Sequence, residues 1–213
     1  MTLASCVRTV WLSSTTSARS LLRVGGRVVT VLALAARHPA RVAAGQLLST
    51  CLPLGEPEAR RHLSPGWKAL RWGQISFPWL NRTTFLWLSR QWRHHPDRTI
   101  DWFIRGMFPA EKRVTARHRA RLRDAAALGF ANHGRGVYDD AQAWCRPPGF
   151  RLEDVRAPLR LWHGQADGVW APGNIPYLAQ RLGGAPVHLL PAEGHMLYLE
   201  NWPAILEEMA RLL

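Results

Sequence analysis

The chain has 213 residues, of which 47% are hydrophobic and 20% are charged. These values suit one globular domain, or a domain with an inserted segment, and exclude a collagen-like chain, a small disulfide-stabilised protein and a wholly disordered chain. Basic residues number 28 against 15 acidic ones, a net charge of +13, and all of the basic residues except Lys68 and Lys112 are arginine.

Residues 1–30 are rich in arginine and serine and contain no acidic residue. This composition superficially fits an organelle transit peptide. The apolar run at residues 28–36 ends at an Arg-His-Pro sequence and is far shorter than the roughly 20 residues that cross a bilayer. We predict that residues 1–30 are not part of the fold and that the protein has no membrane partner.

Residues 31–54 predict a helix around 31–37, a break at Pro39 and a strand at 41–50. Residues 55–150 carry 17 basic and 8 acidic residues and many tryptophans. Their apolar side chains recur at helical spacing, as in Phe85, Leu88 and Trp92. This pattern predicts a mostly helical insertion.

Residues 151–213 carry 5 basic and 7 acidic residues, an ordinary balance for a soluble protein. Strands are expected at 159–163, between Pro158 and Gly164, and at 187–190, where a short apolar run indicates a buried strand. Helices are expected at 174–182, with Asn174 as N-cap, and from Asn201 to the C-terminus, with Pro203 in the first turn. Strands that alternate with helices over short loops indicate parallel βαβ units.

Two loops of the C-terminal third carry residues with catalytic chemistry. Asp167 follows the strand at 159–163, and His195 follows the strand at 187–190. The carboxyl ends of parallel strands share one edge of the sheet, so we expect the two side chains to meet there. A carboxylate at Nδ1 of a histidine fixes the tautomer and leaves Nε2 free to act as a general base. His163 and Glu193 are expected to support these loops.

The sequence DVRAPLRLWHGQAD at residues 154–167, followed by EGHM at 193–196, resembles the C-terminal half of an α/β-hydrolase. The sequence LAARHPARV at 34–42 resembles the helix after the family's nucleophile and the entry to its next strand. The resemblance implies an α/β fold with a parallel sheet, helices on both faces and a helical cap. The core would comprise residues 31–54 and 151–213, and the cap would comprise 55–150.

The same resemblance assigns Asp167 and His195 to the acid and histidine positions of a catalytic triad. It implies hydrolysis of an ester-like or related small-molecule substrate by a nucleophile–His–Asp mechanism, with no metal or organic cofactor. The family's nucleophile lies on a Gly-x-Ser-x-Gly turn before the helix, but this chain has RVGGRVV at residues 23–29. No nucleophile is identifiable there.

Back-translation offers an explanation for the missing turn. Codons for Val24 to Val29, read from the third base of the first codon, permit Gly-Trp-Ser-Gly-Gly. We therefore hypothesise that residues 1 to about 30 are translated out of frame. The alternative function is then a catalytically inactive, truncated or frame-shifted hydrolase fragment.

Two further expectations come from the residue types. Cys6, Cys51 and Cys145 are far apart and show no zinc-ligand spacing, which favours a reducing, cytoplasmic location and predicts that Cys51 and Cys145 pack as small hydrophobes. Nucleic-acid binding is a minor alternative, because Arg113, Arg117 and Arg121 align at helical spacing. No nucleic-acid motif accompanies them, so we predict no nucleic-acid partner.

Overall fold

A computed structural model describes residues 9–12, 22–25, 28–50, 54–55, 57–61, 63 and 65–212. The chain divides into two compact units. An α/β unit comprises Cys6–Leu52 and Pro148–Leu213, and a helical unit comprises Met1–Ser5 and Pro53–Pro147. The prediction for residues 1–30 falls largely outside the described residues and stays a prediction.

The α/β unit is built on a three-stranded parallel sheet in the order β3-β4-β5. Its strands are β3 (Gly45–Leu48), β4 (Leu159–Gly164) and β5 (Val187–Leu190). A separate antiparallel pair is formed by β1 (Thr9–Leu12) and β2 (Leu22–Gly25).

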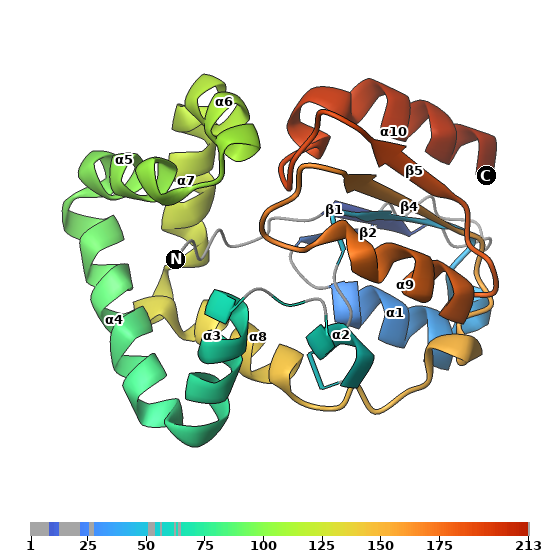
Figure 1. The fold of residues 1–213 in the computed structure, drawn as a ribbon, viewed down its shortest axis with the longest axis horizontal. Helices are drawn as coiled ribbons and strands as arrows, with labels where there is room; N and C mark the ends of the chain where they lie inside the picture. The colour runs from blue at the N-terminus through green and yellow to red at the C-terminus, as the bar shows by residue number, and fades with distance from the viewer. Residues whose placement is uncertain are drawn as a thin grey trace. The chain divides into compact units, whose positions relative to one another are not determined.

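Helices cover both faces of the parallel sheet (Figure 1). On one side lies α10 (Tyr198–Leu212), and on the other lie α1 (Val28–Arg37) and α9 (Ile175–Arg181). Under α10, Leu48 and Trp162 of the sheet form a buried cluster with Leu197 and Ile205. This packing buries the apolar side chains on which the predicted strand at 159–163 and the predicted last helix were based.

The boundaries of two predicted elements require correction. The strand expected at 41–50 is only Gly45–Leu48, because Pro39–Arg41 forms a short 3₁₀ helix first. Asn201 is not the N-cap of the last helix: α10 already begins at Tyr198, and the Asn201 side chain donates to the carbonyl of Leu197. Pro203 consequently lies inside the helix.

The expectation for two more elements also changes in detail. Asn174 precedes α9 but makes no capping hydrogen bond through its side chain. The strand β5 is not buried on both faces as predicted: Val187 and Leu189 are exposed, because they alternate with Leu190, which packs against the cluster under α10, and so lie on the opposite face. On its other face, His188 stacks on the ring of Trp162 at a centroid distance of 4.1 Å.

The helical unit contains seven α-helices among the described residues. They are α2 (Pro57–Arg61), α3 (Pro65–Ser76), α4 (Pro78–His94), α5 (Pro96–Gly106), α6 (Pro109–Arg117), α7 (Arg119–Gly129) and α8 (Arg135–Cys145). The first five begin at a proline. The fixed φ of proline suits the first turn, and its missing N–H costs nothing there because N–H groups of the first turn have no acceptor within the helix.

Aromatic side chains form the core of the helical unit. Phe85 and Trp92 of α4 pack with Phe103 of α5 and with Phe130, and the rings of Trp92 and Phe130 stack at 6.0 Å. Cys145 is buried, as predicted, and burial raises the pKa of its thiol; Cys51 lies outside the described residues.

The basic run that prompted the nucleic-acid alternative does not form one helix. α6 ends at Arg117 and α7 begins at Arg119, so Arg113 and Arg121 lie on different helices. Among the residues that the structure describes, no helix is long and apolar enough to cross a membrane.

We predict that Phe85→Ala lowers the free energy of unfolding by about 3–5 kcal/mol, because it leaves a cavity in the aromatic core. The control is Leu128→Ala on α7, where the side chain is 78% exposed and the expected change is about 0.5 kcal/mol or less. Urea unfolding followed by circular dichroism measures both variants. Equal destabilisation would contradict the assigned core.

Candidate active site

The candidate site lies at the carboxyl edge of the parallel sheet, within the α/β unit. Asp167 lies in the loop after β4 and His195 in the loop after β5. β4 and β5 are neighbouring parallel strands, and Gly164 pairs with Leu190 at the point where both end. The two loops therefore leave the sheet side by side, as the spacing of the strands predicts.

The structure brings Asp167 and His195 into direct contact. Nδ1 of His195 lies 3.0 Å from Oδ2 of Asp167, and both side chains are fully buried. A carboxylate accepts here, so Nδ1 carries the proton and Nε2 is the basic nitrogen. This geometry permits His195 to take a proton through Nε2 while Asp167 stabilises the resulting imidazolium.

Backbone amides hold the other oxygen of the carboxylate. Oδ1 of Asp167 accepts hydrogen bonds of 2.8 Å from the N–H groups of Val169 and Trp170. Burial by itself raises the pKa of Asp167, but the charge and hydrogen bond of His195, the nearby His163 and the Trp170 amide outweigh it. The net effect lowers the pKa, so Asp167 is ionised at neutral pH.

His163 supports the same loop. Its buried Nε2 donates to the carbonyl of Trp170 at 2.9 Å and lies 3.5 Å from Oδ2 of Asp167. Glu193 contributes through its backbone, since its carbonyl accepts from the N–H of Ala166 at 2.9 Å. Both residues take the supporting places that the sequence predicts for them.

A close backbone contact fixes the distance between the two loops. A side chain at Gly164, the last residue of β4, would overlap the backbone of Glu193 and Gly194. The N–H of Gln165 also donates to the carbonyl of Leu190 at 2.9 Å. Glycine at the end of a strand was the available sequence signal, because it often marks such an approach.

A second buried pair lies deeper in the sheet and was not predicted. Nε1 of Trp162 on β4 donates to Oε1 of Gln46 on β3 at 2.6 Å. This bond joins neighbouring strands below the site. Within the described residues, no group of histidine, cysteine and acidic side chains is arranged to hold a metal ion.

Comparison with known proteins supports the fold. No protein-family model matches the sequence, and no curated protein matches it either. In structure, the chain resembles an alpha/beta hydrolase fold protein from Nakamurella multipartita, with a TM-score of 0.53 and 19% identity over 86% of this chain and 65% of that one.

Two further structures have similar scores. A thermophilic esterase from Thermogutta terrifontis has a TM-score of 0.53 and 18% identity, over 86% of this chain and 61% of the esterase. MenH from S. aureus has a TM-score of 0.54 and 14% identity, over 89% of this chain and 64% of MenH. The chain spans less than two thirds of each of these structures. It has a partial α/β-hydrolase fold, which confirms the predicted fold class.

We predict that Gly164→Ala lowers the free energy of unfolding by about 1–3 kcal/mol, because the new methyl group forces the two loops apart. Gly136→Ala in α8 is the matched control, since nothing lies within 4 Å of its added Cβ. Thermal and urea unfolding compare the variants. A Gly164→Ala protein as stable as the control would contradict the close contact.

A second prediction concerns acid stability. The pKa of Asp167 is lowered in the folded state, so its ionised form stabilises the fold above the unfolded pKa of about 3.9, and this stabilisation is lost as the pH falls through the folded value. Asp167→Asn should therefore weaken the pH dependence of unfolding between about pH 5 and pH 2. Urea unfolding across this range tests it; an unchanged slope would contradict it.

Proposed function

We propose that the protein is built for hydrolysis of a small, ester-like substrate. His195 is the general base, and Asp167 orients His195 and stabilises its protonated form. The observation that carries this proposal is the buried hydrogen bond between Nδ1 of His195 and Oδ2 of Asp167. The likeness of the fold to that of α/β-hydrolases supports it. In this proposal the helical unit is the cap of that fold.

The dyad supplies one part of the chemistry. Nε2 of His195 removes a proton from a hydroxyl group or water as that oxygen attacks the carbonyl carbon, and it later returns the proton to the leaving alcohol. The ionised Asp167 lowers the free energy of the transient imidazolium in a buried place where water cannot do so. No metal or organic cofactor takes part in this proposal.

The proposal has two cases, which differ in whether the present chain contains a nucleophile. Residues 23–30, which directly precede and begin α1, contain no serine, cysteine or aspartate. This observation favours a second candidate, in which the present chain is catalytically inactive and a shifted reading frame encodes the missing Gly-x-Ser-x-Gly turn. Sequencing of the coding region tests the shifted frame directly.

We predict that the present chain hydrolyses p-nitrophenyl acetate no faster than its His195→Ala variant. A chain with the restored frame should hydrolyse this ester, and His195→Ala should then lower kcat by about 10³-fold or more. The matched control is His188→Ala, which removes a histidine that stacks on Trp162 outside the dyad.

Each outcome decides between the cases. Turnover by the present chain that disappears in His195→Ala would show that a nucleophile is present without any change of frame. A restored chain whose turnover is insensitive to His195→Ala would contradict the hydrolase proposal itself. A coding region in which no shifted frame encodes the turn would contradict the frame hypothesis alone.

A further inference from the structure

Five large apolar side chains are exposed where α3 ends and α4 begins. Trp79 and Trp72 are 65% and 59% exposed, and the rings of Trp72 and Phe77 meet edge to face at 5.1 Å. We name this cluster the apolar tip; its members are Trp72, Ile75, Phe77, Trp79 and Leu80. A contiguous apolar patch of this kind marks an interaction surface.

The apolar surface continues along α4. Leu80 and Trp87 are seven residues apart and share one face of the helix. Between them, the hydroxyl groups of Thr83 and Thr84 donate to the carbonyl of Leu80 at 2.7 and 3.0 Å. Because these donors are used within the helix, the threonines present methyl groups rather than free hydroxyl groups on this face.

Trp87 leads from this face into a groove between α4 and α5. The groove has a volume of about 320 Å³, and Trp87 and Trp102 line it together with Arg98 and Arg105. The two arginines are seven residues apart on α5 and therefore share a face. Neither forms an ion pair with any residue that the structure describes, although the pKa of Asp101, which the hydrogen bond from Arg119 lowers most, is lowered further by the charge of Arg105.

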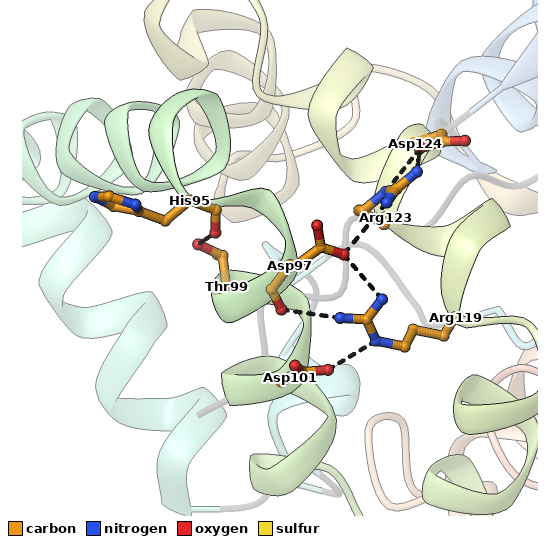
Figure 2. A network of polar contacts seen from close by, with 7 residues as sticks. All are labelled: His95, Asp97, Thr99, Asp101, Arg119, Arg123 and Asp124. Carbon is orange, nitrogen blue, oxygen red and sulfur yellow. Dashed lines mark hydrogen bonds and ion pairs between the residues drawn. The ribbon is translucent and has the colours of Figure 1, made fainter.

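The segment of sequence that carries the apolar tip is basic. Residues 65–96, which include all of α3 and α4, contain five basic residues and no acidic one. On the side of α5 that meets α7 the situation is different, as Figure 2 shows: Arg119 binds Asp97 at 2.9 Å and Asp101 at 2.8 Å, and Arg123 binds Asp124. Arg98 and Arg105 of the groove thus differ from Arg119 and Arg123, whose charges are neutralised by carboxylates.

We propose that the apolar tip and the adjoining groove bind the surface of a lipid bilayer that contains anionic lipids. The tip inserts among the lipid headgroups at the start of α4, and Arg98 and Arg105 contact lipid phosphates at the groove, toward the other end of α4. Such an interface favours tryptophan and arginine. The tryptophan ring lies well at the level of the lipid headgroups, and a guanidinium group can donate two hydrogen bonds to one phosphate. This proposal departs from the expectation of no membrane partner and concerns binding at the surface, not a membrane span.

The combination of charge and apolar surface favours a bilayer over other occupants. A second copy of the chain would bring the same positive charge to the contact and repel it. A nucleic acid would neutralise the arginines but leave the apolar tip in water. An anionic bilayer satisfies both features at once.

Vesicle sedimentation with the full chain tests the proposal. We expect a partition coefficient at least about tenfold higher for vesicles of phosphatidylcholine mixed with phosphatidylglycerol than for phosphatidylcholine alone, and a decrease with added salt. The double variant Trp79→Ala/Leu80→Ala should have a partition coefficient at least about tenfold lower than that of the unchanged chain. Leu128→Ala, which removes an exposed side chain outside the tip, should bind within about twofold of the unchanged chain.

A second pair of variants tests the groove at equal net charge. Arg98→Gln/Arg105→Gln should lose most of the preference for phosphatidylglycerol, whereas Arg113→Gln/Arg121→Gln, on α6 and α7, should keep it. Circular dichroism checks that each variant is folded. Brominated phosphatidylcholine in the mixed vesicles should also quench the tryptophan fluorescence of the unchanged chain, a readout that needs no variant.

Several results would overturn the proposal. Equal binding to both kinds of vesicle, no quenching, or a tip variant that binds like Leu128→Ala would each do so. A dimer in analytical ultracentrifugation that the tip substitutions dissociate, without vesicle binding by the unchanged chain, would assign the surface to a second copy instead. None of these measurements depends on ester hydrolysis, so their failure is distinct from a failure of the proposed function.

Discussion

The ionised carboxylate of Asp167 imposes the strongest constraint on the α/β unit, because it is buried away from water. A charge in such a place is tolerated only when hydrogen bonds and an opposite charge replace its hydration. Two backbone amides and Nδ1 of His195 do this for Asp167. The loop from Gly164 to Trp170 must therefore fold tightly around the carboxylate, and the loop that carries His195 must approach closely enough to reach it.

This constraint explains why small features of the two loops matter. Gly164 has no side chain, which lets the backbone of Glu193 come close enough for His195 to reach Oδ2. His163 donates to the carbonyl of Trp170 and so holds the turn that presents the amides to Oδ1. Removal of one partner from a buried charge commonly costs about 3–5 kcal/mol, so the site and the stability of the unit are coupled.

The sequence predicted the parts of this site that depend on local pattern. Pro158 and Gly164 bound β4, and the short apolar run before Pro191 marks β5, so the positions of Asp167 and His195 at neighbouring strand ends were predictable. The exposure of Val187 and Leu189 was not, because a short run of three apolar residues around His188 is the same whether one face of its strand is covered or both are. Asn201 was mistaken for an N-cap because the turn that starts α10 earlier, after Met196, has no capping residue of its own.

Contacts between distant segments escaped prediction for a different reason. The bond between Gln46 and Trp162 joins residues 116 positions apart, and neither residue type indicates a partner. Likewise, the basic run at residues 112–123 looked like one cationic helix. However, Arg119 is neutralised by Asp97 and Asp101, which lie on α5, far from Arg119 in the sequence. Net charge by itself therefore overstated the positive surface on the α7 side.

The interactions that stabilise the Asp167–His195 pair do not depend on catalysis. The pKa of Asp167 is lowered by groups that belong to the α/β unit itself, namely His195, His163 and the Trp170 amide, and none of them requires a nucleophile. A chain that lacks the nucleophile would still gain stability from the ionised carboxylate, because the buried charge needs its partners whether or not a substrate is turned over. Retention of the Asp167–His195 pair is therefore compatible with both an active and an inactive chain, and the nucleophile that Nε2 would activate, not the pair as such, distinguishes them.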